Sequence, residues 1–197
     1  IFLSGIAERN FNKLVSFNLN KYLILTNPNG SEFSQNLIKE ALINTDKRVK
    51  NDQSVTPGFL IAAMLWPEVL KRSRGDKEIN LRKFFRSMDQ ILRNQQTITA
   101  IPRKFHSYIK DIWVLQLKLH SRIGKQPYKT SKHPRFRAAY DFLLIREKAS
   151  KCKSNLGDWW TKFQKNNSAS QKQQILNLKE VDSENSFKKF GFQEELI

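Results

Sequence analysis

The stretch IPRKFHSYIKDIWVLQLKLHSRIGK, residues 101–125, decides the fold class because its pattern predicts one long amphipathic helix. At about 100° per residue, its apolar side chains fall within an arc of about 120°, and six cations fall in a separate arc of similar width. We expect the apolar arc to bury against neighbouring helices and the cationic arc to face outward. The cations are Arg103, Lys104, Lys110, Lys118, Arg122 and Lys125.

Helical patterns cover most of the remaining chain, and alternating strand patterns are nearly absent, so we predict an all-α fold of about six to eight helices. The first helix is expected over residues 7–25. Further helices are expected after Ser31 or Ser34, after Thr56 as N-cap with Pro57 in the first turn, and after Asn80. The helix that follows Pro57 is apolar nearly all round, which indicates that it is buried.

The stretch GKQPYKTSKHP, residues 124–134, predicts a loop, and residues 133–147, HPRFRAAYDFLLIRE, predict a helix with arginines on both flanks. A last helix contains Trp159 and Trp160. We divide the chain into a helical body region (1–100), a basic region (101–166) and a weakly patterned tail (167–197).

The basic residues concentrate in the second region. The whole chain holds 35 Lys and Arg against 18 Asp and Glu, for a formal charge of +17 and a pI of about 10.1. Residues 101–165 hold 16 basic and 4 acidic side chains, which accounts for +12 of that charge. Clustering of this kind predicts an acidic partner, with nucleic acid first and an anionic membrane surface second.

The predicted nucleic-acid site extends beyond the 101–125 helix. Tyr128, in the predicted loop between two lysines, is the stacking candidate. Core packing is the better interpretation for Phe136, Tyr140, Trp113 and one of the two adjacent tryptophans, because they fall on helical spacing with other apolar residues. The other cations assigned to the site are Lys129, Lys132, Arg135 and Arg137.

No catalytic or metal site emerges from the residues. The three histidines (His106, His120 and His133) lack metal-ligand spacing, and no phosphate-binding loop is present. The close acidic pairs, Asp76 with Glu78 and Asp182 with Glu184, are interpreted as solvated charges. We therefore predict no cofactor in this chain and expect the piece alone to be inactive.

The remaining composition favours a soluble protein of a reducing compartment, which we predict to be the cytoplasm. The single cysteine, Cys152, has no internal disulfide partner. No run of about 18 apolar residues is present. The chain begins at Ile1, and we expect it to be a fragment of a longer protein.

Five motifs occur in order along the basic region: IPRKF (101–105), DIWVLQLKL (111–119), GK (124–125), HPRFRAAYDFLLIR (133–146) and WWTKFQ (159–164). In order and spacing they resemble the C-terminal half of the bacterial poly(A) polymerases, class II nucleotidyltransferases whose siblings are the CCA-adding tRNA nucleotidyltransferases.

The body region carries the same resemblance at NTDKRVKND (44–52) and TPGFLIAAMLW (56–66). The resemblance thus covers about residues 1–166. It implies a class II body fold and a parent enzyme that adds AMP from ATP to RNA 3′ ends, with Mg²⁺ held in a head absent from this chain. Gly30-Ser31 lacks the metal-binding pair of such a head, and Gln126 stands where the family often has arginine.

Several functions stay open. The leading hypothesis is an RNA-binding part of a polynucleotide adenylyltransferase that contacts the backbone of a single-stranded 3′ end. The alternatives are the body of a CCA-adding enzyme, which would bind a folded tRNA, and a basic helical scaffold for an acidic protein or anionic lipid. DNA binding is weaker, because no helix pair with a tight turn presents a recognition helix. We predict no membrane insertion and no obligate protein partner.

Overall fold

The helices begin where side-chain caps and prolines allow. In the computed structural model, which describes residues 3–23, 30–75, 79–150 and 155–181, Ser31 Oγ accepts a hydrogen bond from the Ser34 amide at 3.3 Å. Asn80 Oδ1 accepts one from the Lys83 amide at 3.0 Å. The predicted cap at Asn80 is confirmed, and of the two serines left open for the other helix, Ser31 is the cap. Thr56 precedes a helix as predicted, but its side chain makes no capping hydrogen bond.

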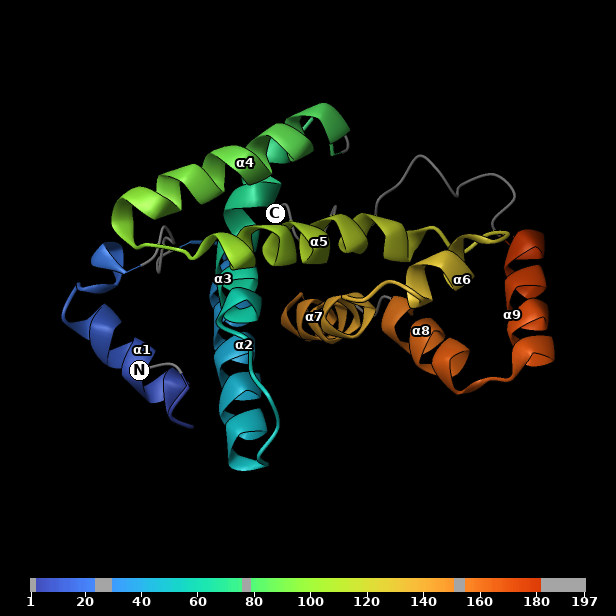
Figure 1. Cartoon of the computed structure of the whole chain (residues 1–197), viewed down its shortest axis with the longest axis horizontal. Helices are drawn as coiled ribbons and strands as arrows, with labels where there is room; N and C mark the ends of the chain where they lie inside the picture. Colours follow the sequence, from blue (N-terminus) through green and yellow to red (C-terminus); the bar gives the residue numbers. More distant parts are fainter. Residues whose placement is uncertain (1–2, 24–29, 76–78, 151–154, 182–197) are drawn as a thin grey trace.

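The described residues form nine α-helices and one 3₁₀ turn and contain no β-strand, so the all-α prediction is confirmed (Figure 1). The elements are α1 (Ala7–Ser16), η1 (Asn20–Tyr22), α2 (Glu32–Lys50), α3 (Pro57–Ser73), α4 (Leu81–Ile98), α5 (Arg103–His120), α6 (Gln126–Ser131), α7 (Phe136–Ala149), α8 (Leu156–Lys165) and α9 (Ser168–Val181).

Several predicted boundaries were wrong. The first helix ends at Ser16 because Asn18 adopts a left-handed conformation, with a φ of 54°. The predicted loop at 124–134 contains helix α6, with Pro127 in its first turn. Part of the weakly patterned tail forms α9. Cys152 and both acidic pairs lie outside the described residues, as do residues 182–197 of the tail.

The larger hydrophobic core surrounds α3, which is buried as predicted. Trp66 of α3 and Trp113 of α5 are both fully buried in it. Trp113 Nε1 donates a hydrogen bond of 3.0 Å to the carbonyl oxygen of Ala62. Helix α3 packs against α2, α4 and α5, and α5 packs in turn against α7, which places α5 along one side of this core (Figure 1).

A second core cluster lies toward the C-terminal helices. Phe136 and Tyr140 pack there as predicted, and both adjacent tryptophans, Trp159 and Trp160, are buried with them, whereas only one of the two was expected in the core. Trp160 Nε1 donates to the carbonyl oxygen of Leu119 at 2.9 Å, which attaches α8 to the end of α5.

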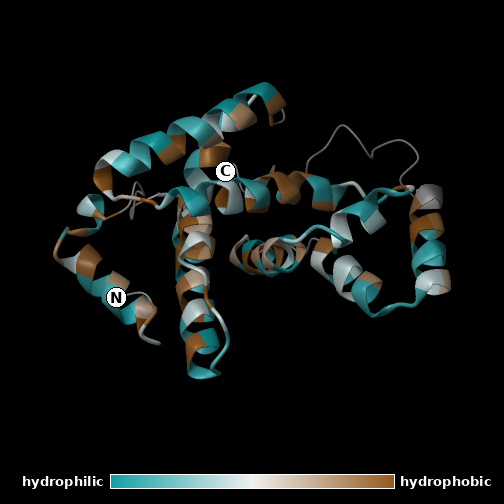
Figure 2. Ribbon diagram, viewed as in Figure 1, coloured by the Kyte–Doolittle hydropathy of each residue, from teal (hydrophilic) through white to brown (hydrophobic). Residues whose placement is uncertain are grey.

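Helices α5 and α7 contribute to both clusters and so connect the two halves of the described chain. The division at residues 100 and 166 stays a prediction. Figure 2 shows hydrophilic and hydrophobic residues interspersed along outer helices such as α1 and α4, as expected when one face of a helix is solvated. Within the described ranges, every helix is too short or too polar to cross a bilayer.

Candidate nucleic-acid interface

The outward face of α5 carries four of the predicted cations. Arg103, Lys104 and Lys118 are exposed, and Lys110 is half-buried. The Lys110 ammonium forms an ion pair with the carboxylate of Asp89 on α4. Asp111 is half-buried, and helical spacing places it on the same side of α5. The cations therefore share a face as predicted, but two carboxylates lie among them.

Arg122 and Lys125 do not belong to that helix, which corrects the prediction of a single helix over 101–125. Helix α5 ends at His120 because Ser121, with a ψ of 89°, leaves the helical conformation. The guanidinium of Arg122 lies 5.6 Å from the ring centroid of Trp159, and its side chain is half-buried. Arg122 therefore packs against the second core cluster, whereas Lys125 is exposed.

Helix α6 and the turn after it present Lys129 and Lys132 to solvent. Tyr128, in contrast, directs its ring toward Phe163, with the ring centroids 5.5 Å apart, and is half-buried against the second cluster. The prediction that Tyr128 lies in a loop is wrong. Its role in stacking on a base stays untested, with part of its ring already covered by Phe163.

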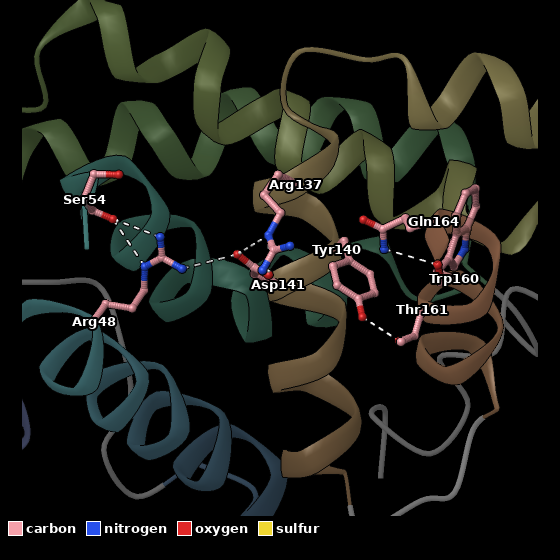
Figure 3. Close-up of polar contacts among 8 residues, drawn as sticks. All are labelled: Arg48, Ser54, Arg137, Tyr140, Asp141, Trp160, Thr161 and Gln164. Atoms are coloured by element: carbon pink, nitrogen blue, oxygen red, sulfur yellow. Dashed lines mark hydrogen bonds and ion pairs between the residues drawn. The ribbon is translucent and has the colours of Figure 1, made fainter. Parts of the chain in front are cut away.

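Two arginines at the start of α7 lie near α5 and α2. The exposed guanidinium of Arg135 stacks 4.9 Å from the ring centroid of Tyr108 on α5. Arg137 Nε lies 3.1 Å from Asp141 Oδ1, and Arg48 of α2 lies 3.5 Å from Asp141 Oδ2 (Figure 3). One carboxylate thus faces two guanidinium groups, which leaves a net positive charge at this junction.

The ring of Tyr108 lies beneath the guanidinium of Arg135. Burial raises the pKa of its phenol above the ordinary value of 10.0, and a hydrogen bond with the Thr56 side chain and the charges of Arg135 and Arg48 partly oppose that shift. Thr56 thus contacts Tyr108 with its side chain rather than capping α3. The phenol is neutral at physiological pH, so the charge of Arg135 is not cancelled from below.

Arg146 is not a flanking surface charge, contrary to the expectation from the 133–147 stretch. Its side chain is 2% exposed, and it donates a hydrogen bond of 2.8 Å to Gln116 Oε1. Its guanidinium lies 5.0 Å from the ring centroid of Trp66. This arginine connects α3, α5 and α7 in the interior and does not contribute to the outer surface.

The three histidines lie apart from one another. His106 contacts Gln96 at 3.0 Å, and the His133 side chain accepts a hydrogen bond from the Arg135 amide at 3.1 Å. Burial, followed by the positive charges of Arg146 and Arg122, lowers the pKa of His120 to about 3. Among the described residues, no group of three His, Cys, Asp or Glu side chains is arranged to hold a metal ion.

The sequence interpretation missed the cations of α4. Arg82, Arg86 and Arg93 are all exposed on one side of that helix. Their spacing of four and seven residues is a helical repeat that the sequence already contains. A charge count over residues 1–100 conceals this repeat, because nine acidic residues offset 15 basic ones there.

The sequence model of the family described as polymerase A arginine-rich C-terminus matches residues 77–190. The chain belongs to this family. The matched range begins just before α4 and contains every predicted site residue.

Curated relatives agree with that membership. The chain is 36% identical over 161 residues to poly(A) polymerase I of Escherichia coli O157:H7, which covers 79% of this chain and 35% of that protein. It is 35% identical over 142 residues to poly(A) polymerase I of Salmonella typhi, covering 69% of this chain and 30% of that protein. The protein of the same name from Haemophilus influenzae is 33% identical over 151 residues, or 73% of this chain and 33% of its own length. The chain thus spans about a third of the length of these relatives.

Proposed function

We propose that this chain is the RNA-holding C-terminal part of a polynucleotide adenylyltransferase, an enzyme that adds AMP from ATP to RNA 3′ ends during polyadenylation. In this proposal the transfer chemistry, with its ATP and Mg²⁺, belongs to a part of the enzyme outside these 197 residues. The chain itself contacts the backbone of a single-stranded 3′ end without reading its sequence. The cytoplasmic location stays a prediction.

The observation that carries the proposal is the set of exposed cations along α5, α6 and the start of α7, in a chain of this family. Arg103, Lys104 and Lys118 share the outward side of one helix whose inner side is buried in both core clusters. Charges on a rigid helix repel one another, and a polyanion relieves that repulsion while its own counterions are released. Phosphates therefore suit this surface better than a neutral partner does.

The test measures binding of fluorescein-labelled oligo(A) by fluorescence anisotropy over a series of salt concentrations. We expect the wild-type chain to bind and its affinity to fall steeply with salt. Replacement of Arg103, Lys104 and Lys118 by glutamine removes three phosphate contacts, which at about 0.7 unit of slope each makes the salt slope less negative by about 2. At about 0.1 M salt, this corresponds to an affinity loss of about 100-fold.

The matched control carries the same loss of charge elsewhere. Lys39, Lys47 and Lys50 are exposed on α2, and replacing all three by glutamine is expected to weaken binding only slightly. Circular dichroism is used to check that both triple variants remain helical. Absence of oligo(A) binding, or equal losses in the two triple variants, would overturn the proposal. Binding to anionic vesicles that RNA does not displace would favour the scaffold alternative instead.

A further inference from the structure

The outer face of α4 is a second cationic surface beside α5. Projected at about 100° per residue, Arg82, Arg86 and Arg93 fall within an arc of about 40°. All three side chains are exposed, and none has a carboxylate partner within the described residues. From the first to the last of them, the row extends about 16 Å along the helix axis, at about 1.5 Å per residue.

Two contacts join the edge of this row to α5. The carboxylate of Asp89, one turn before Arg93, pairs with Lys110 of α5. Toward the end of α4, Gln96 contacts His106 of α5 at 3.0 Å. These contacts fix the second half of α4, which carries Arg93, beside the first half of α5, and they involve the acidic side chain that would otherwise lie between the two rows.

An exposed aromatic side chain accompanies the α4 row. Phe85 is 48% exposed, although the neighbouring Phe84 is fully buried. The two rings meet edge to face, with centroids 5.7 Å apart. Phe85 lies between Arg82 and Arg86 in sequence and one turn before Asp89, so it is on the side of α4 that faces α5. A solvent-facing ring among arginines is the arrangement on which single-stranded bases stack.

We propose that α4 continues the RNA surface of α5, with Arg82, Arg86 and Arg93 contacting phosphates and Phe85 stacking on a base. This inference rests on the proposed function and specifies the path of the strand. Arginine suits the role because its planar guanidinium makes bidentate contacts with phosphate. Binding remains independent of sequence, because every base has a face that can stack on Phe85.

The test uses the full chain and the same labelled oligo(A). Replacement of Arg82, Arg86 and Arg93 by glutamine is expected to weaken binding about 100-fold at about 0.1 M salt and to make the salt slope less negative by about 2. Phe85→Ala is expected to weaken binding about tenfold with an unchanged slope, since stacking releases no counterions. Leu81→Ala is its matched control, because Leu81 is 44% exposed at the start of the same helix and cannot stack.

The outcomes separate this inference from the proposed function. If the α4 triple variant binds as well as the α2 control variant while the α5 triple variant has lost affinity, the α4 surface is not used and the proposed function stands. If Phe85→Ala and Leu81→Ala weaken binding equally, the stacking role is wrong. If the wild-type chain does not bind oligo(A), the proposed function fails and this inference fails with it.

Discussion

Acidification should destabilise this chain through one histidine, His120, which lies at the C-terminal end of α5 with its ring nitrogen Nε2 buried. Its pKa falls from the ordinary 6.5 to about 3, first because the ring is buried and then because Arg146 and Arg122 repel a proton. A helix C-terminus favours a positive charge by about 0.3–1 kcal/mol, up to about 2. The full shift corresponds to about 5 kcal/mol at about 1.4 kcal/mol per pH unit, so burial dominates.

The direction in which pH changes the free energy of unfolding follows from the number of protons bound in the folded and unfolded states. Below pH 6.5 the unfolded chain protonates His120, whereas the folded chain keeps the ring neutral until the pH falls to about 3. The unfolded state therefore binds more protons across this window, and the free energy of unfolding decreases as the pH falls. Between about pH 7 and pH 5, His120 alone should remove about 2 kcal/mol.

The assay is urea unfolding followed by tryptophan fluorescence at the two pH values, for the wild-type chain, His120→Gln and His106→Gln. The wild type should lose about 2 kcal/mol more on acidification than His120→Gln does, since glutamine does not titrate. His106→Gln removes an imidazole from the same helix and serves as the matched control. Any stability change of His120→Gln at neutral pH cancels in this difference. Equal losses in the wild type and His120→Gln would show that the ring is not held neutral, which would refute the reasoning.

Two further predictions concern packing and are tested by thermal or urea unfolding. A Cβ added at Gly157 would lie 2.2 Å from Oε2 of Glu147, whose other oxygen accepts a hydrogen bond of 2.9 Å from the Gly157 amide. The Glu147 carboxylate can move away from the new methyl group, but it then loses this hydrogen bond. Gly157→Ala should therefore cost about 1 kcal/mol despite the better helix propensity of alanine, and an unchanged melting temperature would contradict this. Trp113→Phe leaves a cavity and removes the hydrogen bond to the Ala62 carbonyl, so it should lower the free energy of unfolding by about 2–4 kcal/mol. Its control is Phe17→Leu, at a side chain that is 71% exposed, which should cost less than about 0.5 kcal/mol. Similar urea midpoints for the two variants would contradict the assignment of Trp113 to the core.

Local patterns were sufficient to predict the fold class and several element starts. The caps at Ser31 and Asn80 depend on hydrogen bonds within four residues, which the sequence specifies directly. The burial of α3 follows from an apolar surface on all sides. The outward cations of α5 follow from helical periodicity alone.

The missed features depend on contacts between segments distant in sequence. Arg146 has the same local surroundings as a surface arginine, but Gln116 and Trp66, 30 and 80 residues away, supply the hydrogen bond and the ring that allow its burial. Tyr128 likewise turns inward because Phe163 is there to cover its ring. No local pattern distinguishes these side chains from solvent-facing ones, because their partners are brought near only by the tertiary fold.

The number of cations available to a polyanion is set by these contacts rather than by composition. Of the ten cations that the sequence assigned to the site, Lys110 and Arg137 pair with carboxylates and Arg122 packs on a ring. Exposed ion pairs contribute only about 0–1 kcal/mol, so an arriving phosphate can compete with Asp89 or Asp141 for these two side chains. Lys110 and Arg137 can therefore still bind a phosphate once it has displaced the carboxylate. The other seven of these ten cations have no carboxylate partner in the described ranges, and with the arginines of α4 they are the side chains that the proposed RNA surface offers at first contact. The seven are Arg103, Lys104, Lys118, Lys125, Lys129, Lys132 and Arg135.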